Sequence, residues 1–124
     1  MSNVIYTPDA PAAIGPYSQA IVAGNLVFTS GQIPINPATG NIEAVTIEEQ
    51  TEQVCKNIRA VLEASGSSLE KVVKTVCFLS DMNDFAAFNA VYAKYFTGKP
   101  ARSCVAVKTL PKNVLVEVDT IAEV

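Results

Sequence analysis

The sequence of 124 residues contains no histidine. This absence excludes mechanisms in which a histidine activates a serine or a cysteine, and it excludes ordinary zinc sites with histidine ligands. The three cysteines, Cys55, Cys77 and Cys104, form no CxxC pair, so the spacing typical of cysteine metal sites is missing too. We therefore expect no metal and no cofactor, and chemistry that uses Arg, Lys, Glu, Asp, Tyr, Ser, Cys or the backbone.

Charged residues are scarce, at 17%, and the formal net charge is −3 without any basic run. Proteins that bind nucleic acid by neutralising phosphates need clustered Lys and Arg, so the composition disfavours nucleic acid as a partner. No apolar run approaches the roughly 20 residues that span a bilayer, and residues 1–9 lack a basic-then-apolar signal pattern. Because an odd cysteine count suits a reducing compartment, we expect a cytoplasmic protein without membrane attachment.

What the chain has in abundance is apolar character, at 49% of residues. A chain of this length forms one domain, here residues 1–124. So much apolar surface on a short chain favours burial of part of it between subunits.

The periodicity predicts strands and helices in the order β-β-β-α-β-α-β-β, an α+β mixed sheet with both helices on one face. A hairpin over residues 14–32 turns at Gly24-Asn25, and residues 4–6 add an edge strand. Thr46 to Glu49 fits a capping box for a helix that ends near Ala64. The remaining expected elements are a buried strand over residues 72–79, a second helix over residues 84–95, and two strands over residues 102–107 and 114–124.

The segment Lys99-Pro-Ala-Arg-Ser-Cys-Val105 places Arg102 and Cys104 on one face of an expected strand, because side chains at i and i+2 share a face. The planar fork of an arginine binds both oxygens of a carboxylate. If the last two strands pair directly as a hairpin, Cys104 lies opposite Glu117 and Arg102 opposite Asp119. That register predicts one polar face that carries all four side chains.

Each of these features has a simpler interpretation. Arg102 with Glu117 or Asp119 is also what an exposed cross-strand ion pair looks like, worth about 0–1 kcal/mol. Cys104 is also typical of a small core residue. Tyr17 and Ser30, diagonal neighbours at the open end of the first hairpin, are also consistent with a polar strand end, and Asn89 with a solvent-facing side chain.

Several short strings in order make the chain similar to the RidA (YjgF) family of reactive-intermediate deaminases. They are Ala13-Ile-Gly-Pro-Tyr-Ser-Gln19, Phe28-Thr-Ser-Gly-Gln-Ile-Pro34, Gln50-Thr-Glu-Gln53, Val76-Cys-Phe-Leu-Ser-Asp-Met82, Phe88-Asn-Ala-Val-Tyr92, Pro100-Ala-Arg-Ser-Cys-Val105 and Val116-Glu-Val-Asp-Thr-Ile-Ala122. The resemblance implies a chorismate-mutase-like unit that forms a homotrimer around a central barrel, with sites between subunits. It also implies hydrolysis of 2-enamines and 2-imines, such as 2-aminoacrylate and 2-aminocrotonate from pyridoxal-phosphate dehydratases, to 2-keto acids and ammonia.

Carried over by motif, the resemblance assigns the site to Arg102, Cys104, Glu117, Tyr17, Ser30, Gly31 and Asn89. Arg102 would bind the carboxylate of a 2-imino or 2-keto acid, Glu117 would deprotonate the attacking water, and Tyr17 would close the cleft. Ser30, Gly31, Cys104 and Asn89 would bind and orient the substrate. A Cys104 nucleophile is the less favoured alternative, because no histidine is present to activate the thiol.

Three departures from the family pattern affect the rim of such a cleft. Residues 97–99 form a short loop before Pro100, Ala90 follows Asn89 where many members have an acidic residue, and residues 42–47 are abbreviated. Three other functions stay open at this stage. They are a sensor that binds 2-keto acids without catalysis, an endoribonuclease or translation inhibitor, which the negative charge disfavours, and a holdase chaperone.

Overall fold

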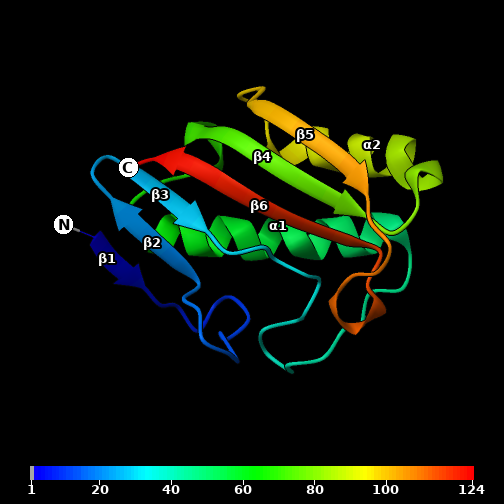
Figure 1. Ribbon diagram of the computed structural model, residues 1–124, viewed down its shortest axis with the longest axis horizontal. Helices are drawn as coiled ribbons and strands as arrows, with labels where there is room; N and C mark the ends of the chain where they lie inside the picture. Colours follow the sequence, from blue (N-terminus) through cyan, green and yellow to red (C-terminus); the bar gives the residue numbers. More distant parts are fainter. Residues whose placement is uncertain (1) are drawn as a thin grey trace.

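The computed structural model describes residues 2–124 as one mixed sheet with two α-helices on a single face (Figure 1). The strands are β1 (Ser2–Ile5), β2 (Ala20–Ala23), β3 (Leu26–Thr29), β4 (Val72–Leu79), β5 (Ala101–Ala106) and β6 (Val116–Glu123), and the helices are α1 (Ile47–Ala64) and α2 (Phe85–Tyr95). This order confirms the predicted β-β-β-α-β-α-β-β arrangement. Within the described range, no helix is both long and apolar enough to cross a membrane.

Helix α1 begins as its sequence predicts. The Thr46 hydroxyl accepts a hydrogen bond from the Glu49 backbone N–H at 3.1 Å, and the Glu49 carboxylate accepts one from the Thr46 N–H at 3.2 Å. The two bonds form the expected capping box and satisfy N–H groups that have no partner inside the helix. They also hold the pKa of Glu49 below its ordinary value, because backbone N–H groups stabilise the charged carboxylate.

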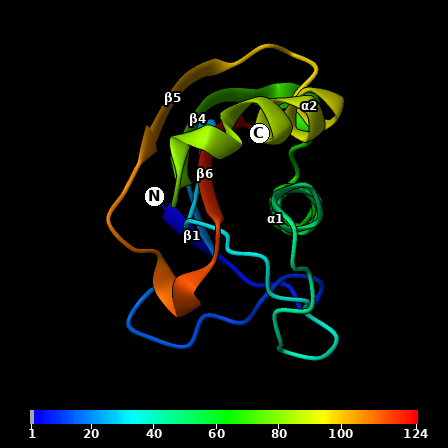
Figure 2. The same cartoon turned by 90° about the vertical axis from the view of Figure 1, so that its right-hand side faces the viewer.

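The core lies between the helices and the sheet, which Figure 2 shows edge-on. Strand β6 alternates strictly: Val116, Val118, Thr120 and Ala122 are buried against the helices, and the residues between them are half-buried on the opposite, open face. Apolar side chains remain accessible on that open face. Phe28 is 41% exposed and Val105 is 47% exposed, so within residues 2–124 no helix or second sheet covers this face.

The strand order is β1-β2-β3-β6-β4-β5. Strand β6 pairs antiparallel with both β3 and β4, while β5 pairs parallel with β4. The hairpin predicted between residues 102–107 and 114–124 is therefore wrong. The chain from β4 through α2 to β5 is a crossover that returns the chain in the same direction, which a parallel neighbour requires. The C-terminal strand then inserts on the other side of β4.

This order also overturns the predicted register. Cys104 lies beside Cys77 rather than opposite Glu117, and Arg102 lies beside Thr75 rather than opposite Asp119. Residues paired across neighbouring strands project to the same face. Arg102 and Cys104 consequently face helix α2, as the buried Thr75 and Cys77 do.

Candidate functional site

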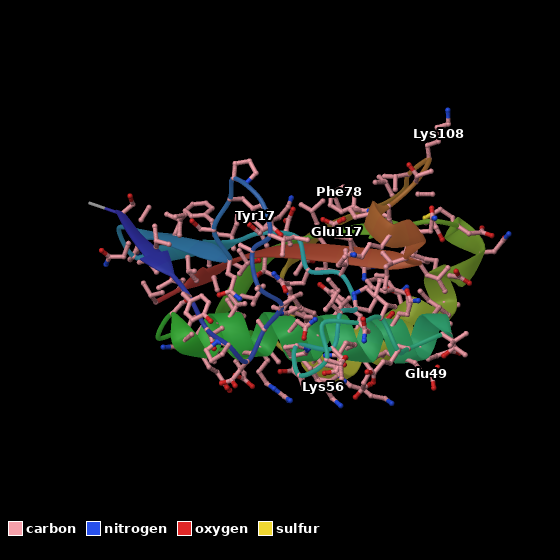
Figure 3. All side chains as sticks on the ribbon, turned by 90° about the horizontal axis from the view of Figure 1, so that it is seen from below. Tyr17, Glu49, Lys56, Phe78, Lys108 and Glu117 are labelled. Carbon is pink, nitrogen blue, oxygen red and sulfur yellow. The ribbon has the colours of Figure 1, made fainter. Side chains whose placement is uncertain are left out.

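A cavity of about 450 Å³ opens on the uncovered face of the sheet at Glu117. Figure 3 shows the Tyr17, Phe78 and Glu117 side chains on this side, and Lys56 and Glu49 beyond the helices on the other. The cavity wall is formed by residues from four segments: Pro11, Ala12, Ile14, Tyr17 and Gln19; Ser30, Gly31, Gln32, Ile33 and Ile35; Pro111 and Lys112; and Glu117. One carboxylate thus lies in a mostly apolar concavity.

Glycine at position 31 makes room for the Glu117 carboxylate. A Cβ built on Gly31 would collide with Glu117 Oε2 and lie 2.9 Å from its carboxyl carbon. The close approach is fixed by two backbone hydrogen bonds, in which Gln32 N–H donates to Val118 O at 2.8 Å and Val118 N–H donates to Gln32 O at 3.2 Å. The Ser-Gly-Gln string of the sequence therefore serves as a backbone wall against the carboxylate.

Tyr17 and Ser30 line the same cavity from the two chain segments at the open end of the β2–β3 hairpin. The Ser30 hydroxyl donates to Ser18 O at 2.6 Å, and Ser30 N–H donates to Gln19 O at 2.9 Å. Because the hydroxyl proton is already used, Ser30 Oγ offers lone pairs, which suit an N–H donor on a ligand. Tyr17 is half-exposed at 52% and lines the mouth of the cavity.

Three buried carboxamide side chains hold loops in place through hydrogen bonds to the backbone, and one of them, Gln19, lines this cavity. Gln19 Nε2 donates to Thr7 O at 3.0 Å, to Ala10 O at 3.3 Å and to Pro11 O at 2.9 Å, while its Oε1 accepts from Thr7 N–H at 2.7 Å. Asn57 and Gln50, both buried on α1, act in the same way on other loops. Asn57 Nδ2 donates to the carbonyls of residues 33 and 35, and Gln50 bonds to the backbone of residues 44 and 115.

Burial makes Glu117 a weaker acid than a free glutamate. Desolvation raises its pKa, and the like charge of Asp119, two residues along the same face, raises it further. Desolvation also raises the pKa of Asp119. A carboxylate with a raised pKa accepts a proton more readily, which is the property that a general base needs near neutral pH.

A second cavity, of about 400 Å³, lies at the other edge of the sheet between α2 and β5. It contains Arg102, whose Nη1 donates to Asn89 Oδ1 at 2.7 Å. The guanidinium carbon lies 5.4 Å from the centre of the Phe85 ring and 4.8 Å from that of Tyr92. Packing over two rings orients the cation, and its five N–H donors leave capacity to bind a carboxylate beside the bond to Asn89.

Cys104 follows Arg102 on β5 and is half-buried next to Cys77. Desolvation raises the pKa of the Cys104 thiol, and this effect outweighs the opposing influence of Arg102. Burial likewise raises the pKa of Cys77 to about 12. Neutral thiols are poor nucleophiles.

The structure thus divides the seven predicted site residues into two sets. Tyr17, Ser30, Gly31 and Glu117 share the cavity on the open face. Arg102 and Asn89 share the cavity beside α2, with Cys104 next to Arg102 on the same face of β5. Because Arg102 and Glu117 project from opposite faces of the sheet, one chain does not bring them together.

Sequence reasoning missed residues that shape both cavities. Gln19, Gln50 and Asn57 are buried polar side chains at positions that the pattern assigned to a strand end or a helix. Lys99 and Lys112, one in each cavity, are non-glycine residues with positive φ, at 53° and 56°. The only signals for these turns were the glycine and proline residues next to them, which mark turns without giving the conformation.

Comparison with known proteins agrees with this arrangement of elements. Residues 7–124 match the family model described as Endoribonuclease L-PSP. A RutC family protein from Pyrococcus horikoshii is 57% identical over 98% of both chains, and 2-iminobutanoate/2-iminopropanoate deaminase from Escherichia coli is 48% identical over 98% of both chains.

Solved structures of related proteins superpose closely on this chain. Yeast Mmf1 superposes with a TM-score of 0.95 at 47% identity, covering 99% of this chain and 98% of Mmf1. Escherichia coli TdcF, solved with bound serine, has a TM-score of 0.94 at 42% identity over 98% of each chain. The chain therefore belongs to the Rid (YjgF) protein family, a family of small α+β proteins.

Proposed function

We propose that this protein hydrolyses 2-imino acids and their 2-enamine tautomers, such as 2-aminoacrylate and 2-aminocrotonate, to 2-keto acids and ammonia. The observation that carries the proposal is the pair of complementary cavities. One presents a carboxylate with a raised pKa beside a hydroxyl acceptor, and the other presents an arginine held by an amide and two rings. A relative that is 48% identical bears the name of this deaminase.

Two copies of the chain are needed to complete such a site. Arg102 and Glu117 lie on opposite faces of one sheet, so Arg102 of one copy would have to meet Glu117 of another. The exposed Phe28 and Val105 side chains on the open face supply apolar surface for that contact. A closed trimer, in which every subunit donates one half of a site to each neighbour, satisfies both requirements with a single type of interface.

The proposed hydrolysis uses the Arg102 guanidinium to bind the substrate and the Glu117 carboxylate as the general base. Arg102 binds the substrate carboxylate through charge-assisted hydrogen bonds worth about 1.5–3 kcal/mol each. Glu117 takes a proton from a water molecule as that water attacks the carbon of the C=N bond, which gives a carbinolamine. Glu117 then returns this proton to the nitrogen and takes the proton of the new hydroxyl group while the C–N bond breaks, so ammonia leaves as the keto group forms. A protonated imine is already electrophilic, so general base catalysis of about 10²–10⁴-fold is the main contribution required.

The proposal is tested by coupling the protein to a serine or threonine dehydratase and timing the appearance of the 2-keto acid. Wild-type protein should accelerate this step, and Glu117→Gln should abolish the acceleration while still binding 2-ketobutyrate. Lys56→Gln, a change on the outer surface of α1, should behave as wild type. Binding of 2-ketobutyrate without any acceleration by the wild-type protein would instead identify a keto-acid sensor.

A mixing experiment tests whether the site is shared between subunits. Arg102→Ala and Glu117→Gln should each be inactive alone. Unfolded together and refolded as a mixture, they should regain about one quarter of the wild-type activity, because random assembly restores that fraction of the interfaces. No recovery from mixed oligomers, verified by mass, would contradict a site built from two copies.

A further inference from the structure

The cavity around Arg102 carries more positive charge than a single carboxylate requires. Its lining consists of eight residues: Asn89, Tyr92, Ala93, Phe96, Thr97, Lys99, Pro100 and Arg102. Two of them are cations and none is acidic, in a chain with a formal net charge of −3. The partners that hold the Arg102 guanidinium in the described part of the chain are a neutral amide and two aromatic rings.

Lys99 is fixed in the turn that leads from α2 into β5. Its φ is 53°, a left-handed conformation that is unfavourable for a non-glycine residue. The Lys99 N–H donates to Phe96 O at 3.4 Å, and the preceding Gly98 packs so closely that an added Cβ would lie 3.1 Å from Glu70 O. Strain of this kind persists where the surrounding structure imposes it, and it is frequent at ligand sites.

One aromatic stack holds the Arg102 guanidinium and leads into the turn that carries Lys99. The Tyr92 ring lies under the Arg102 guanidinium at 4.8 Å and stacks on Phe96 at 4.5 Å. Phe96 is buried at 3% exposure and begins the turn that carries Lys99. The Tyr92 hydroxyl is hydrogen bonded to Thr75 Oγ1 at 2.8 Å, which anchors the stack to β4. The same aromatic stack therefore orients the Arg102 guanidinium and begins the backbone turn from which the Lys99 side chain extends.

We infer that Lys99 is a specificity-determining residue that selects substrates with a second acidic group. In this arrangement, which rests on the proposed deaminase function, Arg102 binds the carboxylate next to the imine and Lys99 binds the side-chain carboxylate. The favoured substrate class is the 2-imino dicarboxylic acids, the imines of aspartate and glutamate. The volume of about 400 Å³ leaves room for the longer side chain.

The test compares imines produced in place by amino-acid oxidases from aspartate, glutamate, alanine and 2-aminobutyrate, with the uncatalysed hydrolysis subtracted. The measured quantity is the ratio of kcat/KM for the dicarboxylic imines to kcat/KM for the monocarboxylic ones. Wild-type protein should give a ratio above one. Lys99→Met should lower the ratio at least tenfold, and Lys99→Arg, which keeps the charge, should restore most of it. Lys56→Met, on the outer surface of α1, should leave the ratio unchanged.

The outcomes separate this inference from the proposed function. Deamination of monocarboxylic imines with the same ratio in wild-type and Lys99→Met proteins would overturn the role of Lys99 and leave the deaminase proposal standing. No acceleration with any imine would refute the deaminase proposal itself. Binding by calorimetry adds a readout that is independent of turnover: oxaloacetate should bind more tightly than 2-ketobutyrate to wild-type protein, and Lys99→Met should remove the difference.

Discussion

The carboxylate of Glu117 occupies the space that a side chain on Gly31 would need. The atoms that would clash belong to the end of a flexible side chain, so an alanine at position 31 would push the carboxylate aside rather than break the sheet. Gly31→Ala should therefore lower kcat about 100-fold, since a displacement near 1 Å costs that much when a catalytic group must be aligned, while the thermal midpoint changes little.

A double-mutant comparison checks that this effect acts through Glu117. In a Glu117→Gln background the residual rate should be insensitive to Gly31→Ala, because the group that the new methyl displaces is already inactive. A further loss of similar size in that background would show that Gly31 acts in another way, for example through the backbone of Gln32.

The raised pKa of Glu117 predicts the acid side of the pH profile. A general base must be deprotonated, so kcat/KM should rise with pH through a pKa above the ordinary range for glutamate. Asp119→Asn removes the like charge that contributes to this shift and should move the acid limb to lower pH. The measurement is kcat/KM against pH for both proteins, and an unmoved limb would show that Asp119 does not influence the base.

The raised pKa of Glu117 also predicts how stability depends on pH: activity should rise with pH, whereas the stability that Glu117 contributes should fall. The folded state raises the pKa of Glu117, so this group contributes stability below its unfolded pKa and that contribution is lost as pH rises through the folded pKa. Glu117→Gln should then raise the thermal midpoint at pH 7 more than at pH 4. Equal midpoint changes at the two pH values would contradict the linkage.

Gln19 should be important for stability as well as for the shape of the cavity. Gln19→Leu leaves the carbonyls of residues 7, 10 and 11 without their side-chain donor, and we expect a loss of roughly 2–3 kcal/mol in unfolding free energy, in line with the cost of buried polar groups without partners. Urea unfolding measures this loss. Asn83→Leu, on an exposed turn, is the matched control and should have little effect.

Cys104 should contribute little chemistry through its sulfur. Its thiol pKa is raised by burial, so the thiolate is a minor species at neutral pH and alkylation by iodoacetamide should be slow. Cys104→Ala should keep the proposed deaminase activity within about threefold, because the loss is confined to packing against Cys77. A folded but inactive Cys104→Ala protein would instead support covalent catalysis by the cysteine.

The local elements were readable from the sequence because each is specified within a few residues. Thr46 and Glu49 mark the start of α1 through a capping box that needs only those two side chains. The turn predicted at Gly24-Asn25 is confirmed, and it pairs Ala23 with Leu26 and Ile21 with Phe28. In both cases, the residues that specify the element are neighbours of the element in the sequence.

The arrangement of the last two strands could not be read in the same way. The valines at 105, 107, 114 and 116 fit a hairpin equally well, and nothing local shows that β6 inserts between β3 and β4. A hairpin register therefore predicts the Arg102 side chain on the Glu117 face, whereas it lies over α2. The partners of Gln19 and Asn57 are also set by loops distant in sequence, which a pattern of single residues does not contain.

The position of β6 has a consequence for how the chain is made. Its pairing of Glu123 with Leu26 and of Thr120 with Thr75 joins the two earlier parts of the sheet, so the interior of the sheet stays open until residues 116–123 have left the ribosome. Contacts this far apart in sequence slow folding. Until then, the pairing edges of β3 and β4 are free, and such edges are where nascent chains associate with one another.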